Sequence, residues 1–182
     1  MSVDDKAAKL IVKQQEKVMY FWMFISAITI GSYIVLWPDL DPFYSLLYGI
    51  PVLFMTSQTS EWSEGFWQGF HSENQLRTSA EGIISRRSGE EVYASNLGMI
   101  RDQQKFSFKM LAVLVGVLVI VSNVETISRF SFIVWPFIIV AVFYVGQFIG
   151  KEAALKKGFH IRITGFPESI LISTAETYLA RA

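Results

Sequence analysis

The sequence contains no cysteine, which excludes disulfide bonds, thiolate nucleophiles and cysteine-ligated metal sites. Charge is scarce as well. Asp, Glu, Lys and Arg make up 18% of the 182 residues, where a soluble domain usually carries about a quarter. The 16 basic and 16 acidic residues balance, so the net charge gives no indication of nucleic-acid binding. Two histidines, His71 and His160, leave little for metal chemistry.

Sequence signatures of common enzymes are also missing. The chain has no HExxH, P-loop, GxSxG or GxGxxG pattern. His71 lies near Glu73, and the Arg86-Arg87 pair precedes two glutamates, but exposed charged loops produce such neighbours routinely. We therefore expect a protein without catalytic residues, without a cofactor and without metal ligands.

Hydrophobic residues are abundant: they make up 52% of the sequence and fall into four charge-free runs. A spanning helix needs about 20 mostly apolar residues, because the hydrocarbon core is about 30 Å thick and a helix rises about 1.5 Å per residue. The first and fourth runs meet this length, and the second and third need polar ends near the headgroups. A buried soluble helix or a re-entrant segment is the alternative for these two. The runs lie between Lys17 and Asp39, Asp41 and Glu61, Lys109 and Glu125, and Arg129 and Lys151.

Basic residues indicate how many of these runs cross the membrane. Four spans place fifteen of the sixteen basic residues on one side of the membrane, with only Arg129 on the other. Omitting the second span changes the split to eleven and five. Because basic residues favour the cytoplasmic side, we expect four spans in the inner (plasma) membrane with both termini in the cytoplasm.

The expected fold class is an all-α membrane protein with four transmembrane helices in two hairpins. The cytoplasmic loop and tail are expected to form a small β-containing module, because two short hairpins around Ser88-Gly89 and over 159–172 could share a sheet. A helix over 174–182 would end the chain. The expected division is an amphipathic segment over 1–17, a first hairpin over 18–60, a cytoplasmic loop over 61–105, a second hairpin over 106–150 and a tail over 151–182.

Four lysines near the amino terminus recur at helical spacing and share one face of a predicted helix. They are Lys6, Lys9, Lys13 and Lys17. One interpretation is that they contact lipid headgroups, at about 1 kcal/mol each near an anionic surface. The other is that this segment is a solvated extension of the first span.

An aromatic segment follows the second apolar run. Trp62, Phe66 and Phe70 recur every four residues, with Trp67 beside them. This pattern favours a helix lying in the membrane interface or continuing the second span. The alternative is a surface for a protein partner, to which Arg86 and Arg87 in the following loop would contribute.

Small residues spaced four apart indicate close helix packing in two of the spans. Ala27-x-x-x-Gly31 lies in the first run and Gly146-x-x-x-Gly150 ends the fourth. We interpret both pairs as candidate packing positions, either within the chain or between copies of it.

Function is less constrained than topology. The four runs contain no ionisable side chain, which argues against a proton- or sodium-coupled transporter. We expect a non-catalytic protein that acts through protein–protein contacts, as an accessory subunit of an envelope or secretion/conjugation machine or as an exclusion or immunity factor. A small channel or transporter subunit is the alternative, and a membrane enzyme with an unfamiliar site is the third class.

The expected partners are membrane lipids and either another membrane protein or further copies of this chain, with no nucleic acid. In size and expected topology alone, the chain is similar to small plasmid-encoded inner-membrane proteins such as conjugation exclusion proteins. No shared motif carries this likeness, so it assigns no role to any residue.

Overall fold

The computed structural model describes residues 3–36, 46–58, 60–72, 89–124, 131–168 and 170–172. Nearly all of these residues are helical, and none of them lies in a β-strand. The all-α prediction is therefore confirmed for the described part of the chain. The elements are α1 (Val3–Leu36), the 3₁₀ turn η2 (Leu46–Tyr48), α3 (Gly49–Thr56), α4 (Ser60–Phe70), α5 (Gly89–Asn123) and α6 (Ser131–Thr164).

Three described helices, α1, α5 and α6, are long and apolar enough to cross a membrane. They contain most of the first, third and fourth apolar runs of the sequence. Most side chains in the apolar parts of α1 and α5 face outward, as expected where a helix contacts lipid tails instead of a protein core. These helices give the chain the make-up of a multi-pass membrane protein.

The second apolar run forms a broken helix instead of the continuous one that we predicted. Its helical part, α3, has eight residues and is therefore about 12 Å long. The break follows Thr56, where the hydroxyl group of Ser57 donates to the carbonyl oxygen of Phe54 at 2.8 Å and its amide donates to that of Leu53 at 3.0 Å. The chain then turns into α4, so the polar end of the run contributes a bend and no further spanning length.

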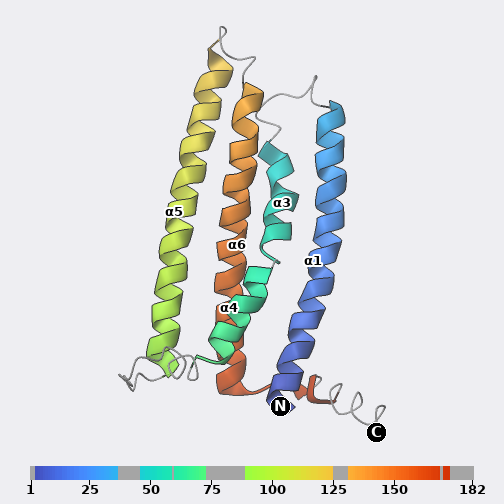
Figure 1. Ribbon diagram of the computed structural model, residues 1–182, viewed down its shortest axis with the longest axis vertical. Coiled ribbons are helices and arrows are strands. Elements are labelled where there is room, and N and C mark those ends of the chain that lie inside the picture. Colours follow the sequence, from blue (N-terminus) through green and yellow to red (C-terminus); the bar gives the residue numbers. More distant parts are fainter. Residues whose placement is uncertain are drawn as a thin grey trace.

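The helices are arranged around α6, which contacts α3, α4 and α5, while α1 packs against α3 (Figure 1). Helices α1 and α5 run in one direction, and α3, α4 and α6 run in the other (Figure 1). The start of α1 lies near the end of α6. We call this the lower end of the molecule, as it is drawn in Figure 1, and the opposite end the upper end.

The predicted β-hairpins are wrong wherever the structure describes them. Tyr93 lies in α5 and stacks on Phe159 of α6, with ring centroids 3.9 Å apart. Val92 and Ile100, eight residues apart along α5, are both buried, and Ile161 is buried in α6. Packing between two long helices thus overrides the short alternation of apolar and polar residues. The loop residues 73–88 of the first hairpin lie outside the described part.

The predicted domain boundaries also differ from the helix ends. The boundaries after residues 17, 105 and 150 each fall inside a continuous helix, in α1, α5 and α6 respectively. These helices therefore continue beyond the apolar runs as charged extensions. Helix α6 ends where Gly165 takes a positive φ of 85°. The predicted helix over 174–182 lies outside the described residues.

Candidate functional site

The lower end contains a cluster of buried hydrophobic residues formed by α1, α4 and α6. Its ring side chains stack along α4, with centroids 5.5 Å apart between Trp62 and Phe66 and 6.1 Å apart between Phe66 and Phe70. We call it the lower aromatic cluster. Its buried members are Ala8, Ile11, Trp62, Phe66, Phe70, Ala154 and Ile161.

The aromatic residues predicted as a partner surface are therefore mostly internal. Trp62, Phe66 and Phe70 are 6%, 0% and 2% exposed, so the alternative of a partner surface does not hold for these three. Trp67 is half-buried and stacks on the ring of His71 at 5.2 Å. Arg86 and Arg87 lie outside the described residues. The aromatic face turns inward because α6 presents small residues that let α4 approach.

The close approach of α4 to α6 depends on glycines at four-residue spacing. On α6, Gly158 faces the carbonyl oxygen of Phe66 in α4, and eight residues earlier Gly150 faces the backbone of Ser57 in the turn before α4. On α4, a Cβ added at Gly65 would lie 2.6 Å from the carbonyl oxygen of Lys151, and one at Gly69 would meet that of Leu155. Contacts this short leave no room for a side chain, so the two backbones touch.

The two predicted small-residue pairs have different surroundings. Gly146 and Gly150 lie against α3 and the turn that follows it, where an added Cβ would meet Thr56 and Ser57. Ala27 and Gly31 are exposed on α1, and the space that a Cβ at Gly31 would occupy has no heavy atom within 4 Å. The α6 pair is thus used for packing inside the chain, whereas the α1 pair stays open.

An ionic layer lies directly below the fourth apolar run. Lys151 Nζ donates to Glu61 Oε2 at 2.8 Å and to Glu64 Oε1 at 3.0 Å, joining α6 to α4. Burial disfavours the charged ammonium group, but these hydrogen bonds and the two carboxylate charges outweigh it and raise the pKa of Lys151 above its usual value. The ammonium group therefore stays charged at neutral pH.

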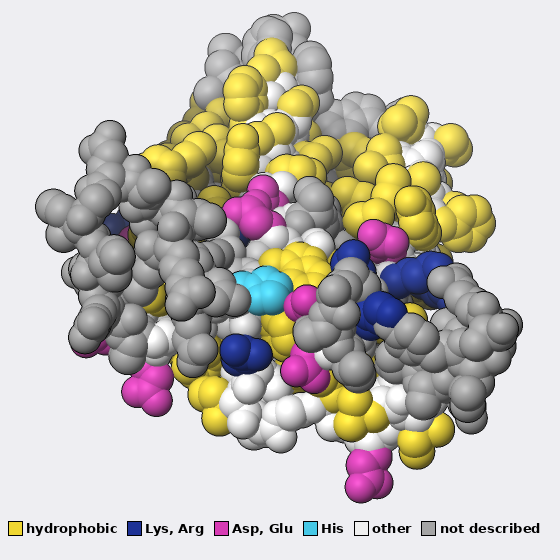
Figure 2. All heavy atoms as spheres, turned by 60° about the horizontal axis from the view of Figure 1, so that its bottom comes forward, with side chains coloured by type: hydrophobic (Ala, Val, Ile, Leu, Met, Phe, Trp, Pro, Cys, Tyr) yellow, Lys and Arg dark blue, Asp and Glu magenta, His cyan; other side chains and the backbone are white. Residues whose placement is uncertain are grey.

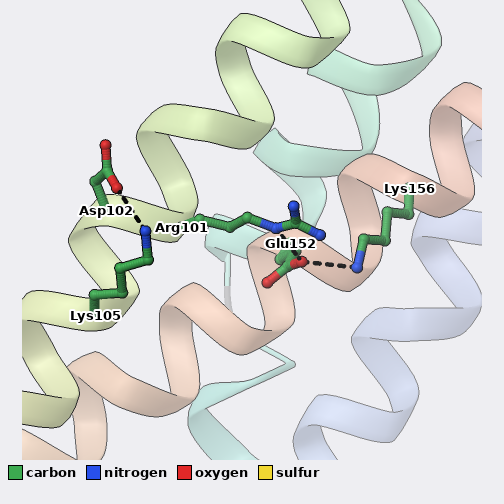
Figure 3. A network of polar contacts seen from close by, with 5 residues as sticks. All are labelled: Arg101, Asp102, Lys105, Glu152 and Lys156. Carbon is green, nitrogen blue, oxygen red and sulfur yellow. Dashed lines mark hydrogen bonds and ion pairs between the residues drawn. The ribbon is translucent and has the colours of Figure 1, made fainter.

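Glu152, which follows Lys151, connects α6 to α5 (Figure 3). Glu152 Oε1 accepts hydrogen bonds from Arg101 Nε at 3.1 Å and pairs with Lys156 Nζ at 2.7 Å. Burial alone would raise the pKa of Glu152, yet its bonds to these two cations lower it below the usual value. A separate exposed pair, Lys105 with Asp102 at 3.2 Å, lies along α5. Two consecutive residues of α6 thus hold it to helices on different sides.

The predicted lipid-contacting lysines lie on the lower half of α1. Lys9, Lys13 and Lys17 are exposed and Lys6 is half-buried. Higher on α1, Ser26 is buried and its hydroxyl group donates to the carbonyl oxygen of Pro51 in α3 at 3.0 Å. This contact is a packing bond between helices and does not by itself form a site.

Several of these contacts were missed by the sequence reasoning. Gly65-x-x-x-Gly69 lies within the aromatic segment and was recognisable by its spacing, and Gly158 continues the spacing of the predicted α6 pair. The roles of Lys151 and Glu152 had no comparable indication, because their partners lie far away in the sequence.

The described residues include no group of three or more His, Asp or Glu side chains that could hold a metal ion. In comparisons with known proteins, no protein-family model, no curated protein and no solved structure matches this chain.

Proposed function

We propose that this chain is a non-catalytic inner-membrane protein that crosses the bilayer four times and acts by binding another membrane protein. Its class would be an accessory subunit of an envelope or secretion/conjugation machine, or an exclusion or immunity factor. Both termini would lie in the cytoplasm, at the lower end of the molecule.

The direction of the helices supports the fourth crossing. Helices α1 and α5 both run from the lower to the upper end. If both cross the membrane, the chain between Leu36 and Gly89 must return to the lower side. The described elements of that interval are η2, α3 and α4, and α3 lies between α1 and α6 (Figure 1). A broken helix suits this place, because neighbouring helices shield its irregular backbone from lipid.

Reporter fusions test this topology. An enzyme that is active only in the periplasm should be silent when fused after Ser79 or at Ala182, and active when fused within 39–41. Activity of the Ser79 fusion together with silence of the fusion at 39–41 would contradict the proposed orientation. Activity of both fusions would mean that the second run does not return to the cytoplasm.

The observation that carries the partner-binding proposal is the open small-residue pair on α1. Small residues at this spacing let two helices approach closely. The α6 pair is filled by α3 within the chain, whereas Ala27 and Gly31 remain exposed among large apolar residues such as Phe24 and Ile28. This face suits a helix of a second membrane protein, because small side chains let a partner helix approach closely.

Cross-linking in intact membranes tests this proposal. A photoreactive amino acid at Ala27 should cross-link a discrete protein, which mass spectrometry then identifies, and Gly31→Leu should abolish that product by filling the face. Gly116→Leu is the matched control, because Gly116 is also exposed in an apolar helix with no atom within 4 Å of the added Cβ. A product that survives Gly31→Leu, or is lost equally in Gly116→Leu, would refute partner binding through α1. Ion conductance by the purified protein in liposomes would instead favour the channel class.

A further inference from the structure

A cleft at the lower end lies between α1 and the segment that follows α6. It consists of two adjoining cavities of about 390 and 300 Å³, which share Ile11, Gln14 and Ile170 as lining residues. Pockets of this size accept small ligands or part of a larger one. The cleft adjoins the lower aromatic cluster, whose Ile11 and Ile161 form part of its lining.

The segment after α6 forms one wall of this cleft because it folds back at Gly165. That residue has a φ of 85°, which favours glycine. The ring of Phe166 then packs against Phe70 with centroids 5.8 Å apart, and the amide of Ile170 donates to the carbonyl oxygen of Pro167 at 2.9 Å. A short helical turn thus holds Ile170 opposite α1.

The charged side chains that line the cleft are all basic, and Glu168 is exposed between two of its lining residues, Pro167 and Ile170. Lys13 and Lys17 line the first cavity and Lys157 lines the second, and none of the described lining residues is acidic. The nearest carboxylate along α1, Glu16, lines a different cavity together with Trp62. Figure 2, which views the lower end, shows several Lys and Arg side chains on the side on which Figure 1 draws α1, beside hydrophobic side chains and near Asp or Glu side chains.

The nitrogen of Lys157 also lies 5.7 Å from the ring centroid of Trp62. This cation–π contact orients the Lys157 side chain towards α4, and Lys157 also lines the second cavity together with residues of α1.

The position of the cleft along α1 relates this charge to the membrane. Lys17 is the last charged residue before the first apolar run. Val18 lines the second cavity, and the next turn exposes apolar side chains such as Phe21, at 58%. The cleft therefore has a cationic opening and an apolar side that continues towards the lipid-facing surface of α1.

We infer that this cleft binds an anionic phospholipid, with its phosphate held by Lys13, Lys17 and Lys157 and its glycerol and upper acyl chain against Val18 and Ile170. A cationic opening beside an apolar wall matches the two ends of such a lipid. The lysines of α1 that the sequence offers as a general headgroup-binding face thus become part of a specific site, together with Lys157 of α6. The inference rests on the proposed membrane embedding and not on the protein partner.

Lipid titration of the full-length protein in detergent, followed by native mass spectrometry, tests this inference. Phosphatidylglycerol should bind more tightly than phosphatidylcholine. Each lysine contributes about fivefold near an anionic surface, so Lys13→Gln with Lys17→Gln should weaken binding about 30-fold and Lys157→Gln alone about fivefold. The arginine double variant, Lys13→Arg with Lys17→Arg, should retain most of the affinity. The matched control is Lys105→Gln with Lys109→Gln, which removes two exposed lysines from α5 and should leave the affinity unchanged.

Equal binding of the two lipids would overturn the inference, because a site for anionic headgroups must prefer phosphatidylglycerol. Equal losses in the α1 and α5 glutamine variants would show non-specific charge attraction instead of a site. Displacement of the lipid by inorganic phosphate at similar concentration would show a phosphate site without a lipid. If the double variant fails to fold, as judged by its thermal unfolding, Lys157→Gln decides alone. The partner proposal is tested separately, because Gly31→Leu leaves all three lysines in place.

Discussion

Replacing Gly158 with alanine tests whether the backbone contact between α4 and α6 holds the lower end together. A Cβ at this position would lie less than 3.0 Å from the carbonyl oxygen of Phe66 and 3.0 Å from the backbone nitrogen of Phe70. Both obstacles are backbone atoms, which cannot rotate away as a flexible side chain can. The two helices must therefore separate to accommodate the new methyl group.

The cost of that separation can be estimated. Adding a methyl group to a well-packed contact costs about 1 to 3 kcal/mol. Because the obstacle at Gly158 is rigid backbone, the cost there lies near the top of this range. A gap of about 0.5 to 1 Å forfeits about a quarter to a half of each dispersion contact, and the buried rings of Phe66 and Phe70 would lose such contacts. Alanine is better than glycine in a helix by about 1 kcal/mol. The net loss in the free energy of unfolding is therefore about 2 kcal/mol, which lowers Tm by about 4 to 8 °C in a chain of this size.

Thermal unfolding of the full-length protein in detergent, followed by tryptophan fluorescence, measures this change, because Trp62 belongs to the lower aromatic cluster. Gly98→Ala is the control. Gly98 lies in α5 with nothing within 4 Å of an added Cβ, so this variant should match the wild type or unfold at a higher temperature. The reasoning is refuted if Gly158→Ala is as stable as the wild type, or if both variants lose the same stability.

Two further predictions concern polar contacts. The lowered pKa of Glu152 means that its stabilising effect is present at neutral pH and is lost as the pH falls through the folded-state value. The unfolding temperatures of the wild type and of Glu152→Gln should therefore differ at pH 7 and converge in acid; a constant difference across that range would contradict the role of the charge. Ser26→Ala removes the hydrogen bond to Pro51 and should cost about 0.6 kcal/mol, as interhelical bonds in membranes do on average. A loss above about 2 kcal/mol in the free energy of unfolding, measured by heat or denaturant, would contradict the assignment of this contact as an ordinary interhelical hydrogen bond.

The length and charge of the apolar runs were enough to predict three of the helices, because the bilayer imposes one length on every spanning helix. The second run was harder. Its polar end, near Ser57, is free of charge and so counts towards a spanning run whether the helix continues or bends there. The bend itself involves hydrogen bonds from Ser57 to the carbonyl oxygens of Leu53 and Phe54. Local composition alone does not decide between those outcomes.

The lower end was predicted less well, because its structure depends on contacts between distant residues. The spacing of Trp62, Phe66 and Phe70 correctly predicted a helix, but not the direction its aromatic face takes. That direction follows from the close contact with Gly158 of α6, which lies 92 residues after Phe66 in the chain. The alternation of apolar and polar residues around Ile161 predicted a strand. Over a few residues, however, a helix packed on one side can carry the same pattern, so the alternation did not distinguish the two.

The continuity of α6 has a mechanical consequence. With 34 residues, it is about 51 Å long, and the hydrocarbon core accounts for only about 30 Å of that length. Its single interior proline, Pro136, lies in its second turn, so the rest of α6 has no proline kink at which it could yield. A partner protein that tilts the membrane-embedded part of α6 would therefore also move the lower end of α6, because the helix moves as one rigid body. The ion pairs of Lys151 and Glu152 would carry that motion to the helices on either side.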